Sequence, residues 1–539
     1  MLENWLRGWL VAVLLGLSSL TPASAVEVVD WRQQALDQVR AATRAETLDW
    51  LSAMPGDAAT ASTWQVSAKL YVDGEVRAFE AAMGSSLPQA STRLGQRLTA
   101  QKLGFDPALG RLFMTVKGPG INTSLVEYQG KALHVVSDVT AVAPVDRQRL
   151  LTTIREQRDY LLRQIDPVHH GFFKLYSARF DRPQENLRVT YSASAIWTLL
   201  QMRDVEADPR IDAVIGPAVD FLLSMQVTEG PHRGAFYYSF KPSTGDKRER
   251  FVVGTVSKVV FTLLDLARRE SDPRYLQAAK RAGDWLLTRV DKNGDVLAAT
   301  SRDLSTGAWT DFGGYSVLYS SEVLSALSRL YGATGDRRYR RSAERIADKL
   351  IAQGAADGFV FGDDFRKPNT ISTSWVAMAL LDYTAVTPSA AAEKAMFAAA
   401  HQVISRQLVV PKKNLLEDGR FFDTWATSGN GWMNEVLVAV YQRCLVRARR
   451  ECLRYRVAMQ RTTRWLVQNT YTAENSYHIP NPERARGGSI RNDKVEAVRT
   501  DAVCHAGNSL IGVWQIMETE TEPVSTVSNK VILPKASRR

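Results

Sequence analysis

The chain has 539 residues, of which 45% are hydrophobic and 23% charged, and its formal net charge at pH 7 is +11. This composition is typical of a globular protein with a large core, which excludes a largely disordered chain. The length predicts several domains, or one large repeat domain with a small one, and the basic balance favours acidic polymers or anionic surfaces as partners.

Residues 1–25 have the pattern of an export signal. Arg7 precedes a short apolar stretch that ends near Leu20, and Ala23-Ser24-Ala25 forms a small-residue cleavage site. The pattern predicts cleavage near Ala25 and a periplasmic or secreted protein, where nucleic acid is not an expected partner. A membrane anchor is the alternative, although the apolar run is shorter than the roughly 20 residues that a comfortable span needs.

The next part of the chain predicts a helix and a small domain. Residues 26–60 are predicted as an N-terminal amphipathic helix. Residues 61–146 contain two extended runs around Asp73-Gly74, a strong hairpin signal, and then one helical and three strand-like runs. This pattern predicts a small α+β domain without a catalytic constellation. We expect it to pack on the rest of the chain or to bind a protein partner in the cell envelope.

One pattern recurs six times within residues 147–520. An amphipathic helix ends at a turn-rich break, and a short extended segment follows, as in "FLLSMQVTEGPHRGAFYYSF" from Phe221. The copies lie roughly 60 residues apart, which is typical of a repeat architecture. Between them lie six runs such as "ISTSWVAMALLDYT" from Ile371, which are apolar on most of their circumference and are predicted to be buried on several sides.

Six amphipathic helices that alternate with six buried ones resemble the (α/α)6 toroid of six-hairpin glycosidases, polysaccharide lyases and sugar epimerases. The resemblance rests on the repeat pattern, without a family signature. It implies a mainly α fold, with the buried helices as an inner ring and the amphipathic helices as an outer ring, preceded by the small α+β domain. A helical-repeat solenoid is the alternative. Residues 521–539 are predicted as a basic C-terminal tail.

In such a toroid the long connections emerge on one face, around the N-termini of the inner helices. Long loops on a rigid scaffold are where binding and chemistry usually lie. A glycosidase needs two carboxyl groups across the scissile bond. A lyase or epimerase acting on uronates needs a base near C5 and a cation that neutralises the carboxylate. We therefore searched the long loops and the starts of the inner helices for these residue types.

The stretch "GRFFDTWATSGNGWMNEV" is the richest in such residues. Asp423 lies in a polar, aromatic loop, and Glu435 lies early in the next inner helix. Both are predicted to be catalytic, while Trp425 and Trp432 are predicted to stack on sugar rings. The alternatives are a turn residue for Asp423 and, for Glu435, an acid that complements the helix dipole.

Three further acidic or phenolic side chains lie in the middle repeats. Asp364 and Tyr315 are predicted to take part in acid–base chemistry, with a loop ion pair as the alternative for Asp364. Glu322 lies within an otherwise apolar inner helix, where burying a carboxyl group is costly. A hydrogen-bonded structural glutamate is the alternative interpretation of Glu322.

Asp501 and His505 lie at the start of the last inner helix, four residues apart, so their side chains share a face. They are predicted to be a catalytic or substrate-orienting pair. The alternatives are a zinc site that also includes Cys504, or a capping aspartate beside a buried histidine. No second cysteine stands at an inner-helix start, so neither a metal nor another cofactor is expected.

The remaining two cysteines, Cys444 and Cys452, flank a short link between two predicted helices. A disulfide that closes this hairpin is one alternative, and two free thiols buried as small hydrophobic groups are the other. The sequence does not decide between them.

The long loops are basic and aromatic. Arg248, Arg486 and Arg499 are predicted to bind anionic groups, because a guanidinium binds carboxylate or sulfate through two parallel hydrogen bonds. Tyr237 is predicted to bind substrate in the cleft. The resulting hypothesis is an exported carbohydrate-active enzyme, a hydrolase, lyase or epimerase, that acts on an anionic or cell-surface polysaccharide. The alternative is a non-catalytic toroid that binds a glycan or a partner in an envelope polysaccharide synthesis or export system.

Overall fold

The computed structural model describes residues 31–43, 63–72, 75–101, 110–119, 121–128, 131–135, 145–409, 417–421, 424, 426–447, 451–473, 475–476, 479–492 and 495–521. The predicted signal segment, Asp423, Trp425 and the predicted tail after Thr521 lie outside the described residues. The chain divides into two compact units, residues 1–71 with 76–135, and residues 72–75 with 136–539.

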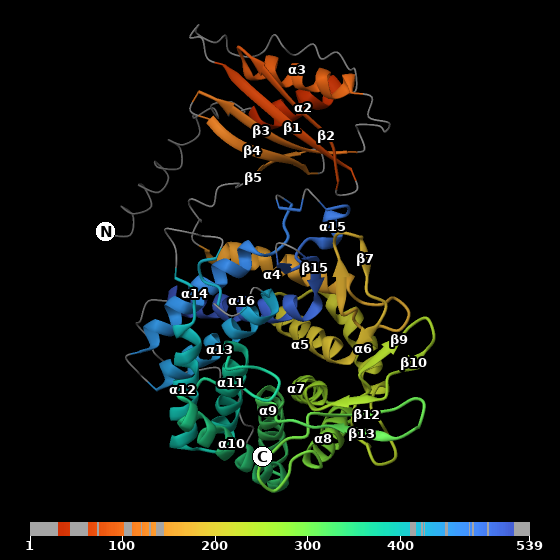
Figure 1. Ribbon diagram of the computed structural model, residues 1–539, viewed down its shortest axis with the longest axis vertical. Helices are drawn as coiled ribbons and strands as arrows, with labels where there is room; N and C mark the ends of the chain where they lie inside the picture. The colour runs from red at the N-terminus through yellow and green to blue at the C-terminus, as the bar shows by residue number, and fades with distance from the viewer. Residues whose placement is uncertain are drawn as a thin grey trace, which may run out of the picture. The chain divides into compact units, whose positions relative to one another are not determined.

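The first unit is an α+β fold built on one sheet of strand order β2-β1-β3-β4-β5. Its elements are α2 (Trp31–Thr43), β1 (Trp64–Val72), β2 (Glu75–Gly84), α3 (Leu87–Ala100), β3 (Arg111–Gly118), β4 (Ile121–Tyr128) and β5 (Lys131–Val135). β3 pairs antiparallel with β1 and with β4, and both helices lie on the same face of the sheet (Figure 1). Leu70, Leu94 and Met114 join sheet and helix in one core, so the predicted α+β fold is confirmed.

The second unit is a double ring of helices. Within the described residues, its inner helices are α5 (Val189–Val205), α7 (Val253–Arg269), α9 (Val317–Thr334), α11 (Thr370–Val386), α13 (Thr427–Val446) and α16 (Thr500–Thr521). Each inner helix contacts the next, and α16 contacts both α13 and α5, which closes the ring. The outer helices are α4 (Arg147–Arg163), α6 (Pro209–Ser224), α8 (Pro273–Leu287), α10 (Arg337–Asp357), α12 (Ala390–Ser405) and α14 (Cys452–Gln468) (Figure 1). The predicted mainly α fold with an (α/α)6 toroid is confirmed.

Three of the outer helices begin with the same local chemistry. Asp208, Asp272 and Asp336 cap α6, α8 and α10, and each carboxylate accepts a hydrogen bond from the backbone N–H of an arginine two residues later. An aspartate at this position satisfies one of the free N–H groups of a helix start and complements the helix dipole. The short connections from inner to outer helices therefore end at well-defined residues.

A disulfide joins α13 to α14. Cys444 and Cys452 are bonded, with their Cα atoms 5.6 Å apart, and Cys504 is a free, buried cysteine. The alternative of two free thiols in this hairpin is thereby excluded. Within the described part of the chain, no helix has the length and apolar character required to cross a membrane.

The long connections lie before the inner helices and contain short strands. These are β6 (Leu175–Ser177), β7 (Arg182–Pro183), β8 (Leu187–Arg188), β9 (Ser239–Lys241), β10 (Asp246–Lys247), β11 (Arg250–Val252), β12 (Ala299–Arg302), β13 (Trp309–Phe312), β14 (Ile490–Asn492) and β15 (Val495–Arg499), with a short helix α15 (Pro482–Ala485). β8, β11 and β15 each run directly into an inner helix. These three strands therefore lie at the N-terminal ends of α5, α7 and α16.

In four of these connections a glycine packs directly against the backbone of the next outer helix. Gly234 follows α6, has a φ of +94°, and lies so close to the backbone carbonyl of Arg281 in α8 that a Cβ atom would clash with its oxygen. Equivalent glycines face carbonyl groups of α10, α14 and α4, and they are Gly294, Gly419 and Gly487. The contact of Gly487 with α4 links the last repeat to the first.

Replacing Gly234 with alanine should destabilise the toroid, because the side chain combines a left-handed backbone with a clash against a fixed carbonyl. We expect the free energy of unfolding in urea to fall by about 2–4 kcal/mol. Gly245 is the matched control, since its φ is +74° and a Cβ atom added there would meet no other atom within 4 Å. Gly245→Ala should cost only about 1 kcal/mol, and equal losses in the two variants would disprove the role of this packing.

Candidate active site

The inner helices direct the same positions toward the axis of the ring. The sixth residues are Ser194, Lys258, Glu322, Trp375, Trp432 and His505, and the ninth residues are Trp197, Phe261, Ser325, Met378, Glu435 and Asn508. Residues three apart on a helix share a face. All of these residues except Glu322 line one axial pocket, which encloses about 540 Å³ of empty space including its open mouth.

The fifth residue of every inner helix is small. These residues are Ala193, Ser257, Ser321, Ser374, Gly431 and Cys504. At Gly431 of α13 a Cβ atom would lie 2.7 Å from the backbone nitrogen of Ala506 in α16, so the two helices are in close contact there. The position of Cys504 in this series makes it a packing residue, and burial raises the pKa of its thiol. Among the described residues, no three His, Cys, Asp or Glu side chains are grouped as a metal site.

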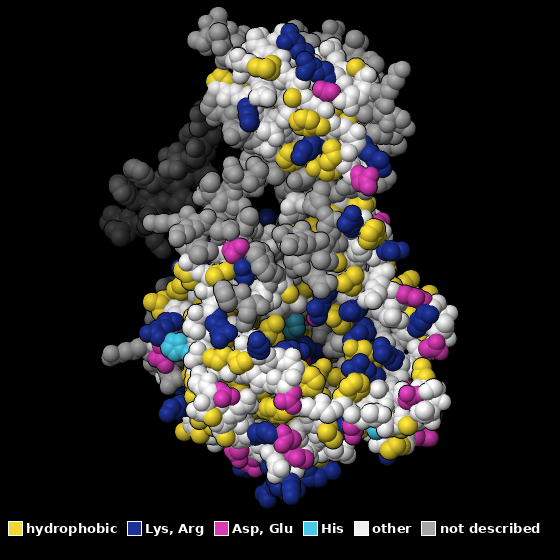
Figure 2. Space-filling view, viewed as in Figure 1, with side chains coloured by type: hydrophobic (Ala, Val, Ile, Leu, Met, Phe, Trp, Pro, Cys, Tyr) yellow, Lys and Arg dark blue, Asp and Glu magenta, His cyan; other side chains and the backbone are white. Residues whose placement is uncertain are grey.

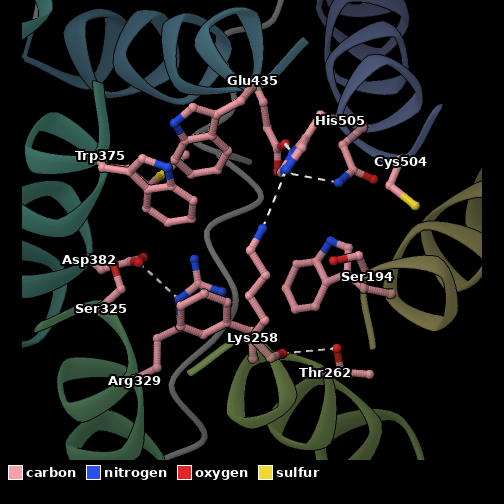
Figure 3. Close-up of a pocket in the computed structure, with 15 residues that line it drawn as sticks. Ser194, Lys258, Thr262, Ser325, Arg329, Trp375, Asp382, Glu435, Cys504 and His505 are labelled. Atoms are coloured by element: carbon pink, nitrogen blue, oxygen red, sulfur yellow. Dashed lines mark hydrogen bonds and ion pairs between the residues drawn. The ribbon is translucent and has the colours of Figure 1, made fainter. Parts of the chain in front are cut away.

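Four polar side chains form a hydrogen-bonded chain at the centre of the pocket (Figure 3). Lys258 Nζ lies 3.4 Å from His505 Nε2, and His505 Nδ1 lies 2.9 Å from Glu435 Oε2. Asn508 donates to the other carboxylate oxygen, Oε1, at 3.3 Å. An ammonium group can only donate, so Nε2 is the acceptor and Nδ1–H is the donor to Glu435. This arrangement holds His505 as a neutral imidazole whose basic nitrogen faces Lys258.

Two indole rings form one wall of the pocket beside this chain. Trp375 and Trp432 are stacked, with centroids 3.7 Å apart and an interplanar angle of 21°. Lys258 Nζ lies 5.1 Å and 5.9 Å from the two ring centroids, and the His505 ring meets Trp432 edge-on at 5.3 Å. The electron-rich ring faces stabilise the ammonium cation, and indole surfaces are suited to the apolar faces of sugar rings.

A further layer of polar contacts lies one helical turn beyond the ninth residues, toward the C-terminal ends of the inner helices. Arg329 Nε donates to Asp382 Oδ2 at 3.0 Å, and its guanidinium lies 4.4 Å from the centroid of Phe261. Gln201 Nε2 donates to Asp265 Oδ2 at 3.2 Å. Both charges of the Arg329–Asp382 pair are satisfied within the protein, which favours a structural role for the pair.

Glu322 is the sixth residue of α9, and one of its carboxylate oxygens, Oε2, has no hydrogen-bond partner among the described residues. The residue is only 4% exposed. The absence of a side chain at Gly254 leaves the space for this oxygen, because a Cβ atom there would clash with it. Burial raises the pKa of Glu322 to about 7, although Lys258 and Arg366 lower it. The carboxyl group is therefore partly protonated at neutral pH.

Glu435, His505 and Trp432 are thus brought together, whereas Asp501 is held separately. Asp501 lies one turn before His505 in α16, but its carboxylate binds Arg499 at 3.0 and 2.5 Å. Arg499 also donates to the Tyr191 hydroxyl at 3.0 Å, and burial raises the pKa of that hydroxyl to about 12. The charge of Arg499 is therefore already balanced by Asp501.

Several other predicted residues lie away from the hydrogen-bonded chain. Asp364 Oδ2 accepts from the backbone N–H of Tyr315 at 2.7 Å, and both residues line a separate open depression. Arg486 binds Glu156 of α4 at 3.0 and 2.8 Å, which neutralises its charge. Tyr237 packs edge-on against Phe251, with centroids 5.7 Å apart.

Lys258 and Trp375 were missed in the sequence. The signal that could have found them is an alignment of the six buried runs on one leucine. Every inner helix has a leucine at its eleventh position, namely Leu199, Leu263, Leu327, Leu380, Leu437 and Leu510. Counting back from these leucines places Lys258, Trp375 and His505 at the same level of the ring.

The helical unit shares its fold with solved enzymes that act on sugars. The chain is similar to the cellobiose 2-epimerase from Spirochaeta thermophila, with a TM-score of 0.52, 16% identity, and coverage of 70% of this chain and 97% of that chain. It is similar to a GH76 α-mannanase from Bacteroides thetaiotaomicron (TM-score 0.52, 12% identity, 69% and 98% coverage) and to a D-mannose isomerase (0.52, 12%, 70% and 99%). These likenesses identify the six-hairpin (α/α)6 toroid. No protein-family model and no curated protein sequence matches the chain.

The carboxyl group of Glu322 should make stability depend on pH. It keeps its proton in the folded state up to a pKa of about 7, while in the unfolded chain it ionises near 4.5, so the free energy of unfolding falls as the pH rises between these values. Glu322→Gln removes this loss, and relative to the native protein the variant should gain roughly 3 kcal/mol between pH 4.5 and pH 8. Urea unfolding across this range measures the difference.

The exposed Glu229 supplies the matched control for this titration. Glu229→Gln measures how much of any difference comes from the exchange of a carboxyl for an amide at an exposed position. If the free energy of unfolding of Glu322→Gln differs from that of the native protein by the same amount at every pH, the buried carboxyl is ionised throughout this range.

Proposed function

We propose that this chain is a carbohydrate-active enzyme that transfers protons at an anionic or cell-surface saccharide bound in the axial pocket. The observation that carries the proposal is the hydrogen-bonded chain from Lys258 through His505 to Glu435, beside two indole rings. A histidine whose Nδ1–H is fixed by a carboxylate is a common form of general base. The fold is one that solved epimerase, isomerase and mannanase structures share, which supports a sugar as the ligand.

The geometry suggests how an anionic sugar would start the reaction. In the structure, the Lys258 ammonium donates a hydrogen bond to the basic Nε2 atom of His505, so this nitrogen is not available as a base. A substrate carboxylate attracts this ammonium and frees Nε2, which then takes the proton from the carbon next to the carboxylate. The electron pair of the broken C–H bond moves toward the carboxylate, where Lys258 stabilises the added charge. Glu435 stabilises the imidazolium that forms.

Proton abstraction fits the pocket better than hydrolysis by two carboxyl groups. The described carboxylates that line the pocket are Glu435 and Asp382, and each is bound to a neighbouring side chain. Hydrolysis needs one carboxyl as acid and a second as base or nucleophile. Elimination or epimerisation at a uronate requires a base beside a cation. We therefore propose lyase or epimerase activity in preference to hydrolase activity.

Replacing His505 should abolish turnover while leaving the fold and ligand binding intact. We expect His505→Asn to lower kcat by about 100-fold or more, because general-base catalysis typically contributes 10²- to 10⁴-fold. Acidic oligosaccharides are the substrates to test. Absorbance of the unsaturated product detects elimination, and NMR detects exchange of the carbon-bound proton in D2O during epimerisation.

His401 in α12 is the matched control, since it is exposed and bonded to Arg454 at 2.8 Å. His401→Asn should keep the native kcat. Activity retained in His505→Asn would refute the proposed base. Tight binding of acidic oligosaccharides without turnover by the native protein would instead favour a non-catalytic glycan-binding toroid.

We further infer that the protein is exported and that the first unit holds an envelope protein partner. The signal pattern of residues 1–25 and the Cys444–Cys452 disulfide support export, because disulfides persist in oxidising compartments. Exposed Val76, Phe79 and Met83 on strand β2 support a docking role. The mature protein should begin at Val26, which N-terminal sequencing checks, and an intact Met1 in the exported protein would contradict cleavage.

A further inference from the structure

Three arginines gather around one tyrosine at the N-terminal ends of α5 and α7. The guanidinium carbon of Arg188 lies 3.6 Å from the Tyr238 ring centroid, that of Arg250 lies at 5.3 Å, and that of Arg248 lies at 5.7 Å. Arg250 also lies 4.8 Å from the Phe312 ring. Figure 2 shows Lys and Arg side chains gathered beside a hollow on the visible face of the helical unit.

These arginines are not balanced by acidic side chains. Arg499 binds Asp501 and Arg486 binds Glu156, but within the described chain Arg188, Arg248 and Arg250 form no ion pair. The Nε atoms of Arg188 and Arg250 are also buried without a hydrogen-bond acceptor. A buried guanidinium N–H without an acceptor carries a desolvation penalty that an anionic ligand would remove.

The Tyr238 ring lies under the face of the Arg188 guanidinium and near those of Arg250 and Arg248, and it offers no acceptor to their N–H groups. Stacking stabilises an arginine through its flat face, and the edge remains available for two parallel hydrogen bonds. Carboxylate and sulfate groups have the matching geometry. The cluster therefore has the features of an anion site rather than those of a structural ion-pair network.

Tyr319 and Glu322 of α9 both face Gly254 of α7, which lies two residues after the strand β11 that begins at Arg250. Burial raises the pKa of the Tyr319 hydroxyl, and so do Glu322 and Tyr238, while Arg366 and Arg250 lower it. Glu322 in turn lies within the electrostatic range of Lys258, which lines the pocket. Arg188 and Arg250 also lie just before α5 and α7, the inner helices whose sixth residues Ser194 and Lys258 line the pocket.

We propose that Arg188, Arg248 and Arg250, arranged around Tyr238, form a second anion subsite for a polyanionic saccharide. One acidic sugar lies at Lys258 and His505, and the anionic group of a neighbouring sugar binds the arginines. The ligand is therefore a chain with acidic groups on successive residues, not a single acidic sugar. This inference rests on the proposed function, because it assumes that the axial pocket holds a sugar.

Calorimetric binding of a uronic acid trimer, its monomer, its methyl-esterified trimer and a sulfated trisaccharide tests this subsite. Arg188→Gln and Arg250→Gln should each weaken trimer binding by roughly 10- to 100-fold, the usual range for a lost charged hydrogen bond. Monomer binding should change by less than about threefold, since the monomer occupies only the axial pocket. The sulfated trisaccharide distinguishes a general anion site from one that prefers carboxylates.

Two further variants keep the test decisive. Arg250→Lys retains the charge without the planar fork and should weaken trimer binding less than Arg250→Gln does. The control is Arg337→Gln, because Arg337 is exposed at the start of outer helix α10 and forms no ion pair within the described residues. Thermal unfolding of every variant confirms that it is folded.

The outcomes separate this inference from the proposed function. Trimer binding that is unaffected by Arg188→Gln and Arg250→Gln, or equally tight binding of the esterified trimer, overturns the second subsite. Arginine-dependent binding of the trimer without turnover by the native protein supports the subsite and refutes the catalytic proposal. Turnover of acidic monomers and trimers with the same KM supports catalysis and overturns the subsite.

Discussion

The geometry of the axial pocket depends on how closely the inner helices approach one another. A small residue at the fifth position of each helix allows this approach, and Gly431 is in near contact with the backbone of α16. The sixth and ninth residues, with the exception of Glu322, then project toward the axis. At the α13–α16 contact this brings Glu435 and His505 within hydrogen-bonding distance, although they are separated by 70 residues in the chain.

The toroid was predictable because its signals are local. Amphipathic and fully apolar helices differ in their own residues, and each repeat carries both kinds. The Cys444–Cys452 disulfide remained an open alternative, because bonding depends on the distance between two helix ends rather than on their sequence. The role of Gly234 could not be predicted either, since its positive φ is imposed by a carbonyl of the following repeat.

The candidate site was predictable only in part. Glu435, Trp432 and His505 stand among polar residues at helix starts, which is why they were identified. Lys258 was missed because one lysine in an apolar helix gives no sign of facing an axis. For two arginines, by contrast, the sequence indicated a ligand-binding role, but the structure shows them in ion pairs within the protein. Arg486 and Arg499 were predicted to bind ligand anions, but Glu156, 330 residues before Arg486 in the chain, and Asp501 already neutralise them.

The balance of charge in the pocket links ligand binding to chemistry. Arg329 and Asp382 compensate each other, and Glu322 is only partly ionised near pH 7. The remaining charges, Lys258 and Glu435, lie on opposite sides of the neutral His505 ring. In the proposed reaction, a neutral sugar would leave Lys258 bound to Nε2 and the base blocked. An anionic group would instead draw the ammonium away and expose a base whose conjugate acid Glu435 can stabilise, so the charge that selects the ligand would also activate His505.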